Sequence, residues 1–393
     1  MWSDSKVWKG HFIDKIGEEI AAEALSVWKY EALLILEDKC MMKKWIFIVV
    51  GVIMLGTMAA CSNPSNTGPD SRGSSVPSAS SSEELSQPET SESTASATPS
   101  QPEEEEDEPV VYMTTDISTE GLMAVYEALN WTPTGNVAVK LSTGEPPASN
   151  YLRPELIADL VQSVDGTIVE CNTAYGGSRA ETAMHYQVAE DHGFTAIADF
   201  QILDENGSMT LPVEGGNRLT ENYVGAAFGD YDSYLILSHF KGHSMAGFGG
   251  AIKNISIGLG SSEGKAWIHS GGTSRTSAWG GEQDAFLESM AEAGKSVSDA
   301  LGDRIVYVNV MNRLSVDCDC DGNPAEPDMH DIGILASTDP VALDQACIDL
   351  VYAAEDGQSL INRIESRNGL HTLEHAEKIG LGSRSYELVS IDE

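Results

Sequence analysis

Basic side chains are scarce in this chain. Its 393 residues hold 23 lysines and arginines against 61 aspartates and glutamates, which gives a net charge of −38. A surface this acidic repels phosphate groups and anionic lipid headgroups, so we expect neither nucleic-acid binding nor flat adsorption to an anionic bilayer. The acidity itself favours solubility.

Long apolar runs are also missing, apart from one short segment near the amino terminus. Residues 45–60 are mainly apolar, but a transmembrane helix needs about 20 apolar residues. Lys43 and Lys44 precede this run, and Cys61 follows it directly. A basic region, a short apolar region and small residues before a break are typical of a secretory signal.

The four residues Met58-Ala59-Ala60-Cys61 resemble a lipobox, which implies cleavage before Cys61 and lipidation of its thiol. We therefore expect residues 42–61 to be a lipoprotein signal peptide, and the protein to lie outside the cytoplasm, anchored to the cell membrane. An uncleaved single-pass anchor is the alternative. Residues 1–41 are explained by a start codon assigned too early or by a short cytoplasmic leader.

Aromatic residues are absent from residues 62–109. Apart from alanine, the only aliphatic side chains there are Val76 and Leu85, and 11 acidic residues face a single arginine, Arg72. Such a segment buries too little apolar surface to offset the chain entropy lost on folding. We expect a disordered acidic linker, extended by its own charge repulsion, ahead of a folded domain over residues 110–393.

Segments typical of strands and helices alternate through residues 110–393. The expected strands lie at 136–141, 167–171, 195–199, 233–238, 304–310, 332–336 and 386–391, and the expected helices at 119–130, 153–163, 179–192, 283–300, 339–352, 359–367 and 370–379. This alternation predicts a single layered α/β domain with a mainly parallel sheet flanked by helices. Ligands of such sheets bind beyond the carboxyl ends of the strands.

Cysteines are too few for a disulfide scaffold, with six in the whole chain. Cys318 and Cys320 lie in the acidic segment D-C-D-C-D, whereas zinc and iron–sulfur sites usually carry C-x₂-C. Thiolates, imidazoles and carboxylates together bind zinc or iron. An acidic surface turn and a Cys-x-Cys disulfide are the alternatives.

The segment S-H-F-K-G-H follows the expected strand at 233–238. Histidine is both a common metal ligand and an acid or base at neutral pH. We expect His239 and His243 to be metal ligands together with Cys318 and Cys320. In the alternative interpretation, one histidine caps the strand and the other is solvated.

Two glycine-rich segments, 247–254 and 264–272, carry further lysines and histidines. They match neither the phosphate-binding G-x-x-x-x-G-K-[ST] loop nor a dinucleotide fingerprint. Glycine lets the backbone approach a ligand closely and direct N–H groups at an anion. The residues expected to bind a small anionic molecule are Lys253, Asn254, Lys265 and His269.

Two acids near the expected strand at 332–336 are candidate catalytic groups. Asp331 precedes this strand, and Asp344 lies one turn into the following helix, so both are expected near the crevice. Lys241 is the third candidate. Asp339 and Pro340 are explained by helix capping and a first-turn proline. Whether the protein is an enzyme stays open.

Together these motifs resemble the domain of unknown function 362 family. The segments S-H-F-K-G-H, G-F-G-G-A-I-K-N, G-K followed by I-H-S, C-D-C and D-I-G-I-L-A-S-T-D-P-V-A-L-D follow in this order within residues 137–352. Members are often fused to ferredoxin-like modules, but this chain has no C-x₂-C-x₂-C-x₃-C run, so a [4Fe–4S] cluster is not implied. The resemblance implies the α/β domain and assigns no reaction.

The sequence thus predicts a membrane-tethered extracytoplasmic protein that binds a metal ion, or a metal-dependent enzyme, acting on a small anionic ligand. The metal would be zinc or iron. The alternatives are a non-catalytic solute-binding lipoprotein and a thiol redox protein that uses Cys318 and Cys320.

Overall fold

The computed structural model describes residues 108–392. The expected signal peptide, the lipid site Cys61 and the linker up to residue 107 lie outside the described residues and stay predictions. Within residues 108–392, no helix combines the length and the apolarity needed to cross a membrane.

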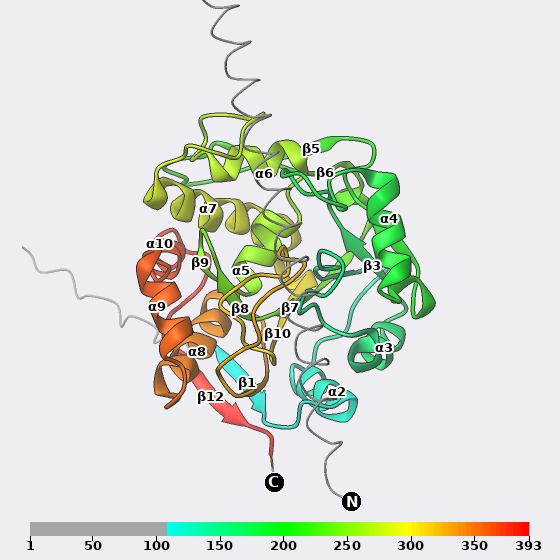
Figure 1. The fold of residues 1–393 in the computed structure, drawn as a ribbon, viewed down its shortest axis with the longest axis vertical. Coiled ribbons are helices and arrows are strands. Elements are labelled where there is room, and N and C mark those ends of the chain that lie inside the picture. The colour runs from blue at the N-terminus through cyan, green and yellow to red at the C-terminus, as the bar shows by residue number, and fades with distance from the viewer. Residues whose placement is uncertain (1–107, 393) are drawn as a thin grey trace, which may run out of the picture. The chain divides into compact units, whose positions relative to one another are not determined.

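One eight-stranded sheet forms the centre of the domain, in the order β12-β1-β11-β10-β7-β2-β3-β4 (Figure 1). Its strands are β1 (Val110–Thr114), β2 (Val137–Lys140), β3 (Gly166–Glu170), β4 (Phe200–Ile202), β7 (Ser233–His239), β10 (Ile305–Met311), β11 (Gly333–Ser337) and β12 (Glu387–Ser390). All neighbouring pairs are parallel except the two that involve β11. The expected α/β fold with a mainly parallel sheet is confirmed.

Two short antiparallel pairs lie outside this sheet. They are β5 (Ser208–Pro212) with β6 (Glu221–Gly225), and β8 (Lys241–His243) with β9 (Gly247–Gly249). The second pair carries two of the expected site residues, Lys241 and His243, directly after β7.

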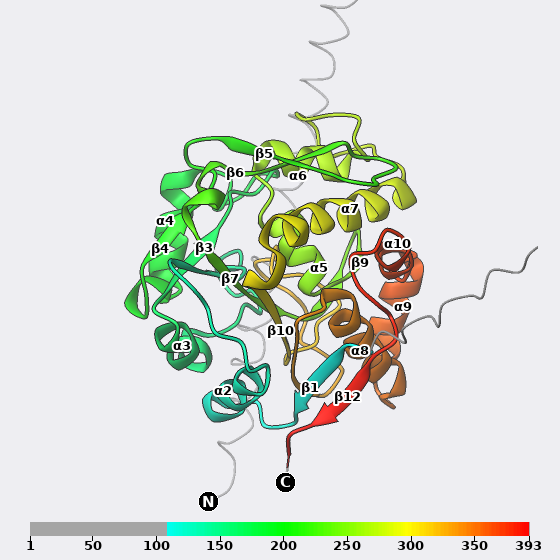
Figure 2. The ribbon, with the colours of Figure 1, turned by 180° about the vertical axis from the view of Figure 1, so that it is seen from behind.

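Helices cover both faces of the sheet (Figures 1 and 2). On one face lie α2 (Thr119–Ala128) and α3 (Pro154–Ser163), and on the other lie α5 (Ala251–Lys253), α7 (Gln283–Leu301) and α8 (Pro340–Ala353). The remaining helices are α4 (Thr182–Asp191), α6 (Ser262–His269), α9 (Gln358–Ser366) and α10 (His371–Lys378).

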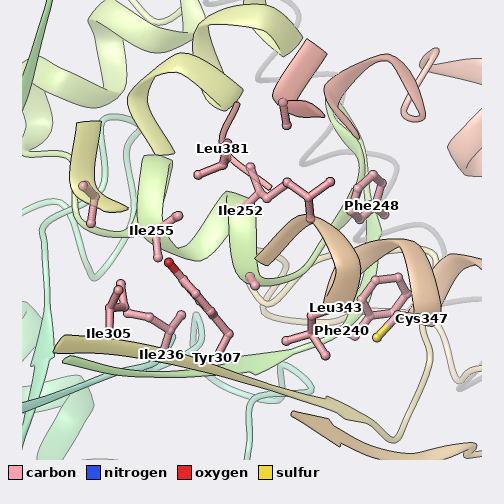
Figure 3. Close-up of a cluster of buried hydrophobic side chains, with 14 of the residues drawn as sticks. Ile236, Phe240, Phe248, Ile252, Ile255, Ile305, Tyr307, Leu343, Cys347 and Leu381 are labelled. Atoms are coloured by element: carbon pink, nitrogen blue, oxygen red, sulfur yellow. The ribbon is translucent and has the colours of Figure 1, made fainter. Parts of the chain in front are cut away.

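The side chains of the central strand β7 alternate between these two layers. Leu235 and Leu237 belong to the cluster with α2 and α3, whereas Tyr234 and Ile236 belong to the cluster with α5 and α8. Figure 3 shows the second cluster, which also contains Ile252 of α5. Because successive side chains of a strand point to opposite faces, a strand covered on both faces is apolar throughout.

One expected strand is wrong. Residues 195–199 are not a strand, and a 3₁₀ turn at Phe194–Ala196 occupies the start of this segment. Its last residue contacts the sheet, where the Asp199 carbonyl oxygen accepts a hydrogen bond from the Ile168 N–H at 2.8 Å. Gly193 before it has φ 85°, a left-handed conformation that ends α4 and favours glycine. The edge strand β4 begins later, at Phe200.

The second glycine-rich segment is also different from its expected form, because it begins as helix α6. Ser261 caps this helix, and its hydroxyl accepts a hydrogen bond from the Gly264 N–H at 3.1 Å. A Cβ at Gly264 would lie 1.9 Å from the Tyr223 carbonyl oxygen, so close packing requires this glycine. Its backbone is therefore not free to hold an anion.

Glu292 of α7 is a buried carboxylate that forms hydrogen bonds to the loop at residues 217–219 and to helix α10. It accepts hydrogen bonds from the backbone N–H groups of Asn217, Arg218 and Leu219, and from His375 Nε2 of α10 at 2.9 Å. Burial alone would raise the pKa of Glu292, but these hydrogen bonds lower it below its ordinary value. The charged carboxylate therefore stabilises the fold.

We expect Glu292→Gln to lower the free energy of unfolding by about 2–3 kcal/mol, because hydrogen bonds to a buried charge are lost. The folded-state pKa lies below the unfolded-state value of about 4.3, so the stabilisation is present above that pH and is lost as pH falls through the folded-state pKa. Urea unfolding at several pH values measures both effects.

The matched control is Asp299→Asn, which removes an exposed charge paired with Lys295 on the same helix. It should cost less than about 0.5 kcal/mol. Equal losses in the two variants would contradict the role given to Glu292.

Candidate functional site

A cavity of about 340 Å³ lies at the carboxyl ends of three parallel strands. Lys140, Glu170 and His239 line it, and each is the last residue of its strand, β2, β3 and β7 respectively. Chain order reverses at this point, because β3 and β4 extend the sheet from β2 in one direction, and β7 and β10 in the other. Sheets of this kind bind ligands at such a reversal.

Most of the lysines of this acidic domain line the cavity. Four of the six lysines that follow residue 109 line it, and an arginine adds a fifth cation. These cations are Lys140, Arg179, Lys241, Lys253 and Lys265. Only two carboxylates, Glu170 and Asp319, line the same cavity. When all seven groups are charged, the cavity wall has an excess of three positive charges.

Glu170 holds two of these cations in place. Lys140 Nζ lies 2.9 Å from its Oε1, and Arg179 Nη1 lies 3.5 Å from its Oε2. Burial alone would raise the pKa of Glu170, but the two cations lower it to about 2. Arg179 also pairs with Glu145 at 3.1 Å and donates to the Tyr175 hydroxyl at 2.8 Å. This wall of the cavity is thus fixed before any ligand arrives.

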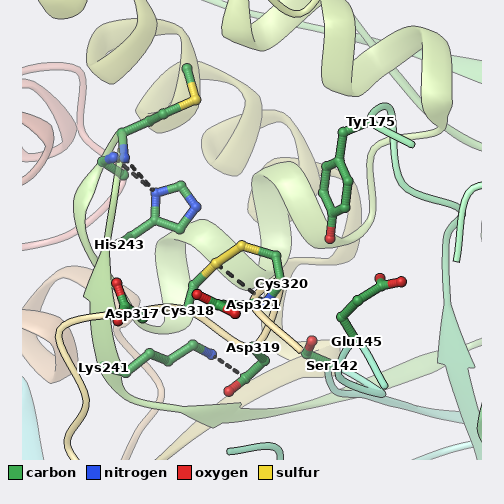
Figure 4. The surroundings of a disulfide bond; sticks show 12 residues. Ser142, Glu145, Tyr175, Lys241, His243, Asp317, Cys318, Asp319, Cys320 and Asp321 are labelled. Carbon is green, nitrogen blue, oxygen red and sulfur yellow. Dashed lines mark hydrogen bonds and ion pairs between the residues drawn. A yellow bond between two sulfur atoms is a disulfide. The ribbon is translucent and has the colours of Figure 1, made fainter. Parts of the chain in front are cut away.

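Asp319 organises the opposite wall, between the two cysteines. Its carboxylate lies 2.9 Å from His239 Nδ1. It also lies 2.7 Å from Lys241 Nζ (Figure 4). Burial alone would raise the pKa of Asp319, but Lys241 and His239 lower it well below its usual range. Lys241 also donates to the His239 carbonyl oxygen at 2.7 Å.

His239 was expected to be a metal ligand, but both of its ring nitrogens are already in hydrogen bonds. Nε2 lies 2.7 Å from the Asn312 carbonyl oxygen, and Nδ1 faces the Asp319 carboxylate. Both partners are hydrogen-bond acceptors, so each ring nitrogen faces a group of the fold. Metal binding by His239 would require the loss of one of these two contacts.

The other three expected metal ligands do come together. His243, Cys318 and Cys320 each offer a ligand atom, and these atoms lie within 4.8 Å of one another on the cavity wall. Cys318 and Cys320 are joined as a disulfide (Figure 4). In this state the sulfur atoms are not thiolates, so metal binding requires reduction of the bond.

The orientation of His243 adds a second condition for metal binding. Its Nδ1 accepts hydrogen bonds from the backbone N–H groups of Met245 at 3.2 Å and Ala246 at 2.9 Å. Burial lowers the pKa of His243 well below its ordinary value, so the ring is neutral and its proton lies on Nε2. That N–H points to the side where the sulfur atoms lie (Figure 4).

All four residues expected to bind an anion line the cavity. They differ in how many of their polar atoms already form hydrogen bonds within the protein. The Asn254 amide contacts Lys140 and Ser238, so it is fully used within the fold. Lys265 donates to the Gly260 carbonyl oxygen at 2.6 Å. His269 Nδ1 donates to the Lys265 carbonyl oxygen at 2.7 Å, which leaves a lone pair on Nε2.

Of the three candidate catalytic residues, only Lys241 lines the cavity. Asp331 is exposed and accepts a hydrogen bond from the Arg313 N–H at 2.5 Å. Asp344 is buried and accepts hydrogen bonds from the N–H groups of Ala251 and Ile252, at 2.8 and 3.0 Å. Burial raises the pKa of Asp344 to about 6. Its place in the fold is to hold the start of helix α5.

Several cavity residues were not named as site residues from the sequence, although Asp319 belongs to the segment D-C-D-C-D. They are Lys140, Glu170, Tyr175, Arg179, Trp279 and Asp319. Lys140 and Glu170 had a usable signal, because each charged residue ends an otherwise apolar strand, V-A-V-K and T-I-V-E. Tyr175 and Trp279 lie on loops and carry no such pattern.

We expect Asp319→Asn to lower the free energy of unfolding by about 3–5 kcal/mol, because it leaves His239 and Lys241 buried without their counter-ion. Chemical unfolding of the oxidised protein measures the change. Asp321→Asn is the matched control, since Asp321 is exposed and lies two residues away. A loss for Asp319→Asn no larger than for this control would refute the anchoring role.

None of the curated proteins matches the chain closely enough to count as a relative. Among solved structures, the lactate racemase apoprotein from Thermoanaerobacterium thermosaccharolyticum is 13% identical with a TM-score of 0.33, over 51% of this chain and 50% of that one. A protein from Thermotoga maritima is 12% identical with a TM-score of 0.34, over 66% and 58%. The chain thus spans only 50–58% of the length of these two proteins. Likenesses this remote assign no activity to it.

The family described as Domain of unknown function (DUF362) matches residues 137–349. This range is more than half of the chain and contains every residue that lines the cavity. The expected resemblance is confirmed, and the chain belongs to the DUF362 family.

Proposed function

We propose that this domain binds a small organic anion in the cationic cavity at the ends of β2, β3 and β7. The observation that carries the proposal is that four of the six lysines after residue 109 line one cavity. The surrounding region, residues 110–393, has 42 acidic and 15 basic side chains, so this concentration of positive charge is local. Clefts lined by one sign of charge raise the local concentration of the opposite ion.

The arrangement of the cations supports binding of a ligand rather than internal pairing alone. Glu170 and Asp319 balance two of the five positive charges, and Glu145, which pairs with Arg179, balances a third. A ligand carboxylate would balance part of the remainder. Lys140 and Lys265 are held by backbone carbonyl oxygens at 2.6 Å, so their ammonium groups need little further ordering. Preorganised groups lose less entropy on binding. The volume of about 340 Å³ suits a small molecule.

A metal ion is the second ligand that we propose, at His243, Cys318 and Cys320. Their ligand atoms lie within 4.8 Å of one another and on the same cavity. Three protein ligands leave one position of a tetrahedral zinc or iron ion open, where a bound anion would complete the shell. The disulfide must first be reduced, and the His243 proton must move from Nε2 to Nδ1, which breaks the two backbone contacts of Nδ1.

The proposed setting is the outer side of a cell membrane. The support is the sequence alone: the signal-like segment 42–61, with the lipid site Cys61, and the acidic linker 62–109. Such a tether suits both a solute-binding lipoprotein and a surface enzyme.

We expect millimolar oxalate, pyruvate or citrate to raise the melting temperature of the full chain in detergent, because binding to the folded state stabilises it. Lys253→Met should weaken the best of these anions by about tenfold or more, since a charged hydrogen bond of 1.5–3 kcal/mol is lost. Lys295→Met, which removes a lysine paired outside the cavity, should leave the affinity unchanged. No stabilisation by any of the three anions would overturn the proposal.

The affinity should also fall as pH rises through about 7. Burial and the neighbouring Lys241 lower the pKa of Lys253 to about 7, and the neutral amine no longer attracts an anion. Burial keeps His243 and His269 neutral in this range, because it lowers the pKa of His243 well below its ordinary value and that of His269 to about 4. Calorimetric titration between pH 6 and 9 measures the trend.

We expect the full chain, reduced under anaerobic conditions, to bind one Co²⁺ per protein with the absorption of a thiolate complex. Co²⁺ is a spectroscopic substitute for zinc, and thiolates are its charge-transfer donors. The double variant Cys318→Ser, Cys320→Ser should lose this absorption. The oxidised wild-type protein is the matched control, and equal uptake by oxidised and reduced protein would rule out this metal site.

A further inference from the structure

Lys253 differs from the other lysines of the cavity in having no partner. Lys140 pairs with Glu170, Lys241 pairs with Asp319, and Lys265 donates to a backbone carbonyl oxygen. Within residues 108–392, no hydrogen bond or ion pair engages the Lys253 amine, although the side chain lines the cavity. This amine is therefore available to a ligand.

The backbone at Lys253 is held on both sides. The Asp344 carboxylate accepts hydrogen bonds from the first two N–H groups of α5, the helix that ends with Lys253. The next residue, Asn254, is fixed by Ser238 Oγ at 3.0 Å and by the Lys140 ammonium at 2.9 Å. A π-helical turn, η3 (Asn254–Gly258), follows directly, and such turns are frequent at functional sites.

Glycine in β9 makes room for the lysine stem. A Cβ at Gly249 would lie 3.2 Å from Lys253 Cδ, which is tighter than ordinary contact. Gly249 is thus explained by the passage of this side chain, whereas a Cβ at Gly250 would meet the Asp344 carboxylate. A fixed backbone and a fitted stem limit where the amine can reach.

The charges around Lys253 favour its neutral form. Asp319, the anion that would stabilise its ammonium, is already shared by Lys241 and His239. Burial lowers the pKa of Lys253 to about 7, and the cations Lys241, Lys140 and Lys265 add to this effect. A lysine desolvated beside other cations is an active nucleophile near neutral pH, because a sizeable fraction is unprotonated.

We propose that the Lys253 amine condenses with the carbonyl carbon of a 2-oxo acid bound in the cavity. The nitrogen attacks the carbonyl carbon, a C=N bond replaces the C=O bond, and the carbonyl oxygen leaves as water with the two amine hydrogens. No oxidant or reductant takes part. This inference rests on the proposed anion binding, since the adjoining cations must hold the ligand's carboxylate while its neighbouring carbonyl group reaches Lys253.

The test is reductive trapping of the full chain with pyruvate and cyanoborohydride, followed by peptide mass mapping. We expect one reduced pyruvate adduct, located on Lys253, at a level at least about tenfold above any surface lysine, because the bound ketone is held next to the amine. Lys295 and Lys378, the two lysines of the described region outside the cavity, are the internal reference. Lys253→Arg is the matched variant, since it keeps a cation but has no amine that condenses.

Each outcome decides a different point. An adduct on Lys253 that is absent from Lys253→Arg supports the inference. Pyruvate that stabilises both proteins without trapping on Lys253 overturns the imine and leaves anion binding intact. Equal trapping on Lys253, Lys295 and Lys378 also overturns it, because the reaction is then not directed by the cavity. Absence of any stabilisation by pyruvate, oxalate or citrate overturns the underlying anion-binding proposal and the imine with it.

Discussion

The pairing of buried cations with two buried carboxylates is the constraint on which the rest of the site depends. Glu170 holds Lys140 and Arg179, and Asp319 holds Lys241 together with His239. Buried charges without partners cost several kcal/mol, so these two carboxylates are what allows Lys140, Arg179 and Lys241 to be buried as cations. The carboxylates are fewer than the cations even when Glu145, the second partner of Arg179, is included, and this surplus supports the proposal that the cavity binds an anion.

Cys318 and Cys320 were expected to bind a metal ion as thiolates, but in the structure they form a disulfide. Two cysteines in an acidic segment and two histidines after a buried strand favour a metal site, and both cysteines and His243 do converge. The hydrogen bonds to His243 Nδ1 and the disulfide nevertheless leave neither a ring lone pair nor thiolates facing the cavity. Metal binding therefore requires reduction of the disulfide, whereas the lysines and Arg179 line the cavity in the disulfide-bonded protein as well.

Periodicity and motif order were enough for the fold class, the family and much of the cavity lining. Lys253, Lys265 and His269 could be selected because they accompany glycine-rich segments after a buried strand. The sequence does not show which side chains far apart in the chain form contacts. It therefore could not show that Asp319 contacts both His239 and Lys241, or that both ring nitrogens of His239 face acceptors of the fold. The strand expected at 195–199 fails for a local reason, since Gly193 ends a helix and a 3₁₀ turn follows.

The central claim is that the cavity holds an anion, and anomalous diffraction from crystals grown in bromide tests it most directly. Bromide reports sites of positive potential and is located without ambiguity by its own scattering. The account predicts the strongest bromide peak inside the cavity, in contact with the amine of Lys253. Bromide confined to the outer surface, with the cavity filled by water alone, would contradict it.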